Sequence, residues 1–79
     1  MVNIMTQDGN MEQVTQIWYE EQHSMGLNDE MIYCGVNLYG HDVKGVKRLL
    51  GTFEDLDEAK NELIKINNSK DFIKQITIY

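Results

Sequence analysis

The N-terminal part of the chain shows the alternation of apolar and polar residues that is typical of strands with one buried face. Residues 2–6 alternate in this way, and the tetrad that follows them, residues 7–10, contains the Asp-Gly pair of a tight hairpin turn. Met11–Glu21 is rich in β-branched and aromatic residues, which favours a second strand. The polar stretch Gln22–Glu30 contains a glycine and an Asn-Asp pair and is therefore interpreted as a loop.

Two further strands are predicted in the middle of the chain. In Met31–Tyr39 every second residue is apolar, and we expect one face of this strand to be buried, with the residues Ile32, Cys34, Val36 and Leu38. The glycine-bracketed segment Gly40–Gly45 then predicts a hairpin turn into a fourth strand, Val46–Phe53. Both faces of this fourth strand are partly apolar, so its pattern leaves the buried face open.

One amphipathic helix is predicted after the fourth strand. Asp55 is a suitable N-cap, and Glu58 follows at the spacing of a capping box. The apolar residues that form one face of the helix recur at helical spacing, and they are Leu56, Ala59, Leu63 and Ile66. Asn67-Asn68-Ser69 is expected to end the helix, and Asp71–Tyr79 is expected to form a closing strand.

These elements predict an α+β fold, with an antiparallel sheet of four to five strands and one helix packed on one face, in the order β-β-β-β-α-β. With 79 residues the chain is expected to form a single small domain, residues 1–79. Its single cysteine, Cys34, excludes an intrachain disulfide and is expected to be a buried apolar side chain in a strand. The first ten residues contain no basic leader, so we expect a cytoplasmic protein.

Charge is distributed unevenly along the chain. The net charge is −6, and all seven Lys and Arg residues come after residue 43. The first 43 residues contain seven acidic residues and no Lys or Arg, which argues against direct binding of nucleic acid. Such a segment would attract a basic partner, although acidic residues also serve simply to keep a small domain soluble.

No arrangement of residues predicts catalysis, a cofactor or a metal site. Gly51 precedes the helix, but the acidic residues at the helix start would repel a phosphate, so we interpret Gly51 as a strand residue that leaves room for packing. His23, His41 and Cys34 do not pair at a spacing typical of metal ligands. The neighbours His41 and Asp42 are interpreted as part of a turn rather than as an acid–base pair.

The strongest functional prediction is a surface that binds a protein partner. Trp and Tyr are enriched at the energetic centres of interfaces, and the chain has Trp18, Tyr19, Tyr33 and Tyr39, each of which could also fill the core. We predict that acidic residues steer a basic partner while Trp18 or Tyr33 anchors it. The acidic residues of this predicted surface are Glu12, Glu20, Glu21, Asp29 and Glu30.

Two segments, Ile4–Tyr19 and Leu49–Ile66, resemble a loose group of short uncharacterised proteins from phages, prophages and mobile elements of Gram-positive bacteria. The resemblance rests on a Gln-Asp turn after the first strand and a Leu-Gly-Thr-aromatic strand end before a helix with Glu-Ala-Lys. It implies a small cytoplasmic protein of the bacterial host with no assigned chemistry. A phage origin would fit an inhibitor of a basic host protein, such as a CRISPR effector.

Three hypotheses about function follow. The first is a non-catalytic acidic interaction protein that binds, and could inhibit, a basic host protein, without contact to nucleic acid or membrane. The second is a small oligomeric ligand-binding domain or enzyme with a site at the subunit interface, in which a pocket would place His41 or His23 beside a carboxylate. The third is a self-assembling protein, for instance a homodimer paired through the edge strand Asp71–Tyr79.

Overall fold

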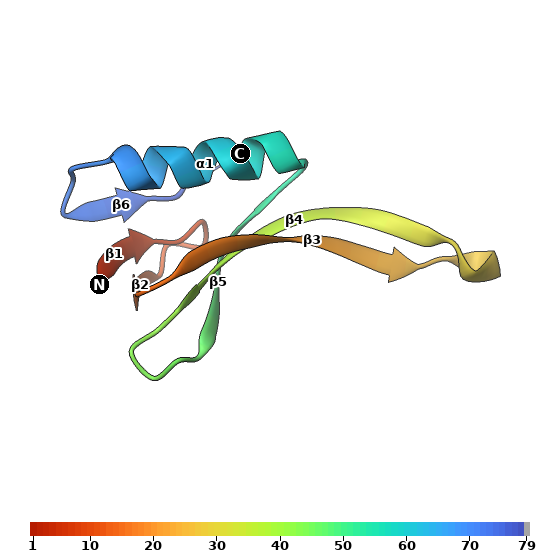
Figure 1. The fold of residues 1–79 in the computed structure, drawn as a ribbon, viewed down its shortest axis with the longest axis horizontal. Helices are drawn as coiled ribbons and strands as arrows, with labels where there is room; N and C mark the ends of the chain where they lie inside the picture. The colour runs from red at the N-terminus through yellow and green to blue at the C-terminus, as the bar shows by residue number, and fades with distance from the viewer. Residues whose placement is uncertain (79) are drawn as a thin grey trace.

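The structure, a computed structural model, describes residues 1–78 and has an α+β fold. Figure 1 shows its elements along the chain. They are β1 (Val2–Met5), β2 (Met11–Val14), β3 (Ile17–Met25), the short 3-10 helix η1 (Leu27–Asp29), β4 (Met31–His41), β5 (Lys47–Phe53), α1 (Leu56–Asn68) and β6 (Ile73–Gln75).

The strands form two small sheets instead of the one larger sheet that we predicted. One has the order β2-β1-β6 and the other the order β3-β4-β5. The predicted second strand, Met11–Glu21, is divided between them, because the chain leaves one sheet at Thr15 and enters the other after Gln16. The backbone amide of Thr15 donates to the carbonyl of His41, and the amide of His41 donates to the carbonyl of Gln16, so this corner is hydrogen-bonded.

The closing strand is much shorter than predicted. Within Asp71–Tyr79 only β6 is regular, and it pairs in parallel with β1; Tyr79 lies outside the described residues. Phe72 is 83% exposed just before β6. Ile78 is 69% exposed, so that Ile76, which is fully buried, joins the core without these two neighbours.

The helix is confirmed in its bounds, its cap and its buried face. The Asp55 side chain accepts a hydrogen bond from the Glu58 amide, and the Glu58 carboxylate accepts one from the amide of Glu54. The helix covers a core made by both sheets, with the buried residues Ile4, Val14, Val36, Leu38, Leu50, Phe53, Ala59, Ile66 and Ile76. Leu56 and Leu63 pack against this core from the helix.

The buried face of the helix also contains a carboxylate that the apolar pattern does not indicate. Glu62 is 3% exposed, and its Oε1 accepts a hydrogen bond of 2.7 Å from the Thr77 amide. The same oxygen lies 2.9 Å from the Lys65 ammonium, one turn along the helix. Glu62 thereby attaches the segment after β6 to the helix, since a buried charge is tolerated when it is paired and hydrogen-bonded.

An irregularity in the β4–β5 pairing explains why the sequence pattern left the buried face of β5 open. Leu38 pairs with Gly51 and its neighbour Tyr39 pairs with Leu49, so Leu50 is an extra residue in β5. Leu50 is therefore buried together with Gly51, whereas Leu49 is 49% exposed. Residues that strict alternation assigns to opposite faces are in this way buried side by side.

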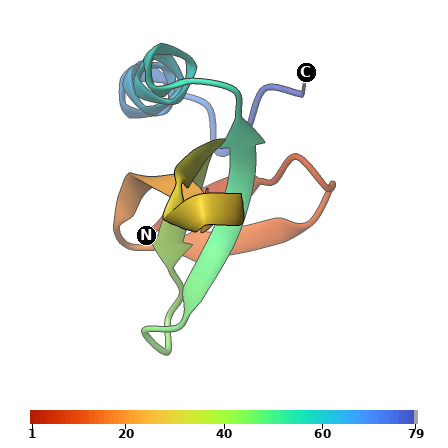
Figure 2. The ribbon, with the colours of Figure 1, turned by 90° about the vertical axis from the view of Figure 1, so that its right-hand side faces the viewer.

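The most prominent feature of the fold is a two-stranded projection, residues 22–34, which we call the arm (Figures 1 and 2). It consists of the end of β3, the turn around η1 and the start of β4. The predicted loop Gln22–Glu30 is thus mainly strand and tight turn. The molecule extends over 47 × 26 × 19 Å, and its long axis follows the arm.

The arm begins where the pairing of β3 and β4 is irregular. Glu21 pairs with Val36 and His23 pairs with Tyr33, so Cys34 and Gly35 are opposite a single residue of β3. Beyond this bulge the strands leave the core, and for that reason the prediction that Ile32 and Cys34 are buried is wrong: both are exposed. The Cys34 thiol lies 3.3 Å from the Ser24 hydroxyl.

Candidate functional site

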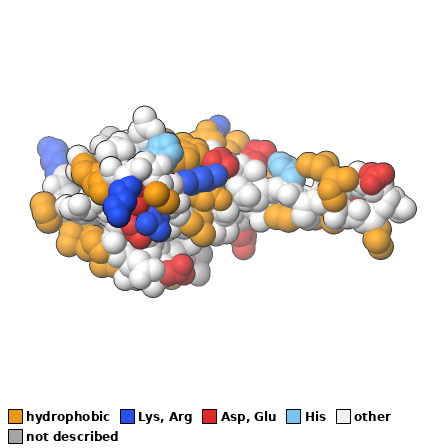
Figure 3. All heavy atoms as spheres, turned by 90° about the horizontal axis from the view of Figure 1, so that it is seen from below, with side chains coloured by type: hydrophobic (Ala, Val, Ile, Leu, Met, Phe, Trp, Pro, Cys, Tyr) orange, Lys and Arg blue, Asp and Glu red, His pale blue; other side chains and the backbone are white. Residues whose placement is uncertain are grey.

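The arm exposes large apolar side chains in a part of the chain that has no Lys or Arg. The side chain of Leu27 is 90% exposed. Those of Met25 and Met31 are between 60 and 70% exposed, and those of Ile32 and Tyr33 are just under half exposed. Figure 3 shows apolar, acidic and histidine side chains along the arm, with the visible Lys and Arg residues on the body. Exposed apolar patches of this kind mark interaction surfaces.

One face of the arm continues the face of β3 that contacts the core. Ile17 and Tyr19 pack against the core, and strand alternation places His23 and Met25 on the same side further out. Their partners across the arm are Tyr33 and Met31. The rings of His23 and Tyr33 meet edge to face at 5.8 Å.

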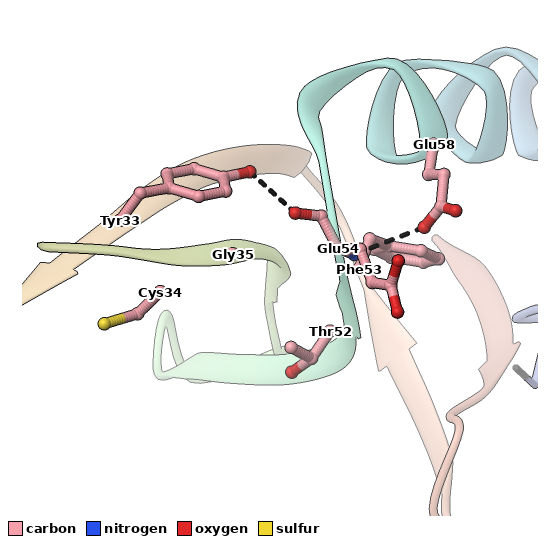
Figure 4. A pocket seen from close by; sticks show the side chains of 7 residues that line it. All are labelled: Tyr33, Cys34, Gly35, Thr52, Phe53, Glu54 and Glu58. Carbon is pink, nitrogen blue, oxygen red and sulfur yellow. Dashed lines mark hydrogen bonds between the residues drawn. The ribbon is translucent and has the colours of Figure 1, made fainter.

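Tyr33 connects the base of the arm to the start of α1. Its hydroxyl donates a hydrogen bond of 2.9 Å to the carbonyl oxygen of Glu54 (Figure 4). The pKa of the Tyr33 hydroxyl is raised, first because the group is partly removed from water. The negative charges of Glu21, Asp55 and Glu58 raise this pKa further. Three carboxylates therefore lie near the base of the arm on the helix side.

A cleft of about 660 Å³ opens at this place, between the edge of β4 and the start of α1. Apolar ring surface and carboxylates both contribute to its walls. The residues that line it are Tyr33, Cys34, Gly35, Thr52, Phe53, Glu54 and Glu58. Such a lining suits a ligand that combines apolar and positively charged groups.

The opposite face of the β3-β4-β5 sheet has a second cluster of polar and aromatic groups. The indole N–H of Trp18 donates a hydrogen bond of 2.7 Å to Glu20, and Glu20 also pairs with Lys47 at 3.0 Å. The Lys47 ammonium lies 4.1 Å from the centre of the Tyr39 ring. The hydrogen bond from Trp18, followed by that from Lys47, lowers the pKa of Glu20. The polar and charged groups of this cluster therefore pair with one another within the chain.

Asp42 makes contacts within the turn after β4, whereas His41 contacts residues at or just before the start of β3. His41 Nδ1 lies 3.1 Å from the side-chain oxygen of Gln16, and its ring lies 4.6 Å from that of Trp18. The Asp42 carboxylate accepts hydrogen bonds from the amides of Lys44 and Val46 and pairs with Arg48. The interpretation as part of a turn is confirmed for Asp42, whereas His41 is the last residue of β4 and pairs with Lys47.

We expect Asp42 to make the stability of the protein depend on pH in acid. The Val46 amide first, and then the Lys44 amide and Arg48, favour the charged carboxylate, so its pKa is lowered on folding. A lowered folded-state pKa gives stability that is present above the unfolded-state pKa and is lost as the pH falls through the folded-state value. Unfolding in urea, measured at about pH 6 and about pH 3, should therefore show a smaller acid destabilisation in Asp42→Asn than in the wild type.

Asp71→Asn is the matched control for this measurement. The Asp71 carboxylate is exposed and accepts no hydrogen bond from another described residue. We therefore expect its replacement to leave the wild-type pH dependence unchanged. Equal acid destabilisation in the wild type and in Asp42→Asn would contradict the prediction.

The structure brings only part of the predicted binding surface together. Glu21 and Tyr33 lie at the base of the arm, and Asp29 and Glu30 lie at or beside the turn at its tip. The other predicted residues lie elsewhere: Trp18 and Glu20 on the opposite face of the same sheet, and Glu12 in β2 of the other sheet.

The pairs between the two halves of the chain also reduce the charge asymmetry. The acidic residues Glu20 and Asp42 of the first half pair with Lys47 and Arg48 of the second. The acidic residues around Tyr33, in contrast, come from both halves, since Glu21 is joined there by Asp55 and Glu58. The arm itself contains acidic residues but no Lys or Arg.

Several residues of the arm and its base did not enter the predicted site. Met25, Leu27 and Met31 lie in or beside the segment that we interpreted as a loop, and Glu54 and Glu58 were interpreted only as parts of the helix start. The available signal was the presence of Met25 and Leu27 in the middle of an otherwise polar segment, with Met31 directly after it. Long exposed apolar side chains beside a turn are unusual unless they make a contact.

No protein-family model, curated protein or solved structure matches this chain. The resemblance to short phage and prophage proteins stays a prediction. Within residues 1–78, the only helix of more than one turn is too short and too polar to cross a membrane.

Proposed function

We propose that this protein is a non-catalytic interaction protein that binds a basic protein partner through its arm. The exposed apolar surface of the arm is the observation that carries the proposal. Five large apolar side chains there are at least 46% exposed, four of them on the two strands and Leu27 in the turn. Within residues 1–78 no third strand pairs with these two strands over residues 22–34. A two-stranded ribbon of this kind is marginally stable in water by itself, which supports a role in contact with another molecule.

The charge around the arm supports the chemical class of the partner. The tip contributes Asp29 and Glu30, and the base contributes Glu21 together with the acidic residues at the start of α1. Complementary charge increases the rate of association and disfavours partners of the same sign. A basic host protein, of the kind that binds nucleic acid, fits this surface.

The experiment compares capture of proteins from a lysate of a Gram-positive bacterium by three tagged forms of the chain. The first form is the wild type, and the second is the arm variant Met25→Ser/Leu27→Ser/Met31→Ser. The control variant Val43→Ser/Val46→Ser/Ile64→Ser makes equivalent changes at exposed residues of the body. Circular dichroism checks that all three are folded.

We expect the wild type and the control variant to retain a basic protein that high salt releases. We expect the arm variant to bind that protein at least about tenfold more weakly, since apolar anchors at the centre of an interface supply most of its energy. Equal retention by the arm variant and the control variant would show that the arm is not the binding surface. Recovery of the bait alone, with a stable homodimer in sedimentation, would favour self-assembly instead.

A further inference from the structure

The edge of β4 is open at the base of the arm. Strand β5 pairs with β4 only as far as Val36 and Phe53, after which the chain turns away into α1. Over Met31–Cys34, no strand among the described residues lies on this side of β4. An open strand edge presents backbone N–H and C=O groups that can pair with a strand of another chain.

The cleft described above lies beside this open edge. Figure 4 shows Tyr33, Cys34 and Gly35 of β4 on one side and Glu54 and Glu58 on the other. Gly35 has no side chain to obstruct the place where β4 and β5 separate. The cleft therefore leaves room for a strand to continue from the point where β5 leaves the sheet.

The charges on the two sides of the edge differ. On the side that faces α1, Tyr33 lies near Glu21, Asp55 and Glu58 and is hydrogen-bonded to the backbone of Glu54. On the other side, Cys34 lies beside Ser24 and the backbone of Ile32. Because successive side chains of a strand point to opposite faces, an added strand would meet acidic residues with every second side chain.

We propose that the Met31–Cys34 edge binds an extended segment of the partner, in which basic side chains alternate with apolar ones and whose backbone adds to β4 as a further strand. The basic side chains would face the acidic residues at the start of α1, and the apolar ones would face Ile32 and Cys34. This inference rests on the proposed function and specifies the segment of the partner that the arm recognises.

A synthetic peptide tests the proposal without the natural partner. The probe has about nine residues of alternating lysine and valine, blocked at both ends and labelled for fluorescence anisotropy. Two control probes have the same sequence with a methyl group on every second backbone nitrogen, one starting at the first residue and the other at the second. Each of them blocks the hydrogen-bond donors along one edge of the peptide strand, so that one of the two cannot donate to β4. Hydrogen exchange measured by NMR then locates the bound peptide.

We expect the unmodified probe to bind at low salt and to protect amides within Met31–Gly35 from exchange. We expect one of the two methylated probes not to bind, because an added strand is held by hydrogen bonds along one of its edges. Glu54→Gln/Glu58→Gln should weaken binding about 3- to 10-fold, since each removes one charge from the cleft. Glu58→Gln keeps an acceptor for the backbone amide of Glu54.

Asp71→Asn/Glu12→Gln is the matched control, because it removes two charges from exposed or partly exposed residues that lie away from the start of α1 and do not line the cleft. This control variant should bind the probe as the wild type does. Equal binding of all methylated probes, protection of the outer edge of β3 in place of β4, or no binding at millimolar probe would overturn the proposal.

The two proposals fail in different ways. The probe experiment depends on the edge of β4, whereas capture of the natural partner depends on the apolar arm. Loss of partner capture in the arm variant, together with no binding of the probe, would leave the proposed function intact and reject strand addition. Binding of the probe with unchanged capture by the arm variant would reject the proposed function of the arm while the edge still binds peptide.

Discussion

Gly35→Ala is expected to lower the free energy of unfolding by about 3 kcal/mol, because the position combines a left-handed backbone with a close backbone neighbour. Gly35 has φ +102, which an L-residue adopts only at a cost. A Cβ atom there would lie 2.8 Å from the carbonyl oxygen of Phe53, and a backbone atom of a paired strand cannot move away freely. Equilibrium unfolding in urea, followed by circular dichroism, measures the effect.

Gly45→Ala separates the two causes. Gly45 also has a positive φ, +78, but a Cβ atom there would have no neighbour within 4 Å. We therefore expect Gly45→Ala to lower the free energy of unfolding only by the cost of the left-handed backbone, about 1 kcal/mol. If the two variants lost equal stability, the close approach of Gly35 to Phe53 would not contribute to the loss of stability in Gly35→Ala.

The second large effect is expected for Gln7→Ala, which should lower the free energy of unfolding by about 2–4 kcal/mol. The Gln7 side chain donates to the carbonyl oxygens of Thr52 and Thr77 and accepts a hydrogen bond of 2.7 Å from the Thr52 amide. It therefore joins β5 of one sheet to the segment after β6 of the other. Its replacement removes all three hydrogen bonds and leaves their backbone partners to water. Urea unfolding measures the loss.

Gln13→Ala is the control for Gln7→Ala. The Gln13 side chain donates one exposed hydrogen bond, to Asn3, so the same chemical change should cost less than about 0.5 kcal/mol. A loss of stability in Gln7→Ala no larger than that in Gln13→Ala would show that the hydrogen bonds of Gln7 do not hold the sheets together.

Gly51 allows Gln7 to reach its partners, and a double-mutant cycle can measure this dependence. A Cβ atom at position 51 would lie 2.9 Å from Gln7 Cδ and 2.9 Å from Ile76 Cγ2. We expect Gly51→Ala to cost less stability when Gln7 is already alanine, with a coupling of about 1 kcal/mol. The interpretation that Gly51 leaves room for packing is confirmed, and the side chains that use this room are those of Gln7 and Ile76.

The sequence predicted best where neighbouring residues alone control the structure. The helix was predicted with its cap at Asp55 and its buried face, because helical spacing and capping act within a few residues. The β4–β5 hairpin was predicted for the same reason, from a turn bracketed by glycines. In the candidate site, the local pattern placed Tyr33 in a strand and the acidic residues at the helix start.

Long-range contacts decided the rest. Residues 22–25 and 31–34 look different in sequence, and only their pairing with one another makes them the arm. Bulges at Cys34–Gly35 and at Leu50 changed which residues are buried, because one extra residue reverses the alternation of a strand. The cleft required Tyr33 and Glu58, which are 25 positions apart in the chain, to lie beside each other.

The sequence by itself thus determined the α+β class, the amphipathic helix and the absence of Lys and Arg from the first 43 positions. Only the tertiary structure decided that the strands divide into two sheets, that Glu62 is buried against Thr77 and that the apolar residues of the arm remain exposed. The physical reason is that helix formation and net charge depend on local or summed properties of residues. Burial and strand pairing depend instead on which distant segments come into contact.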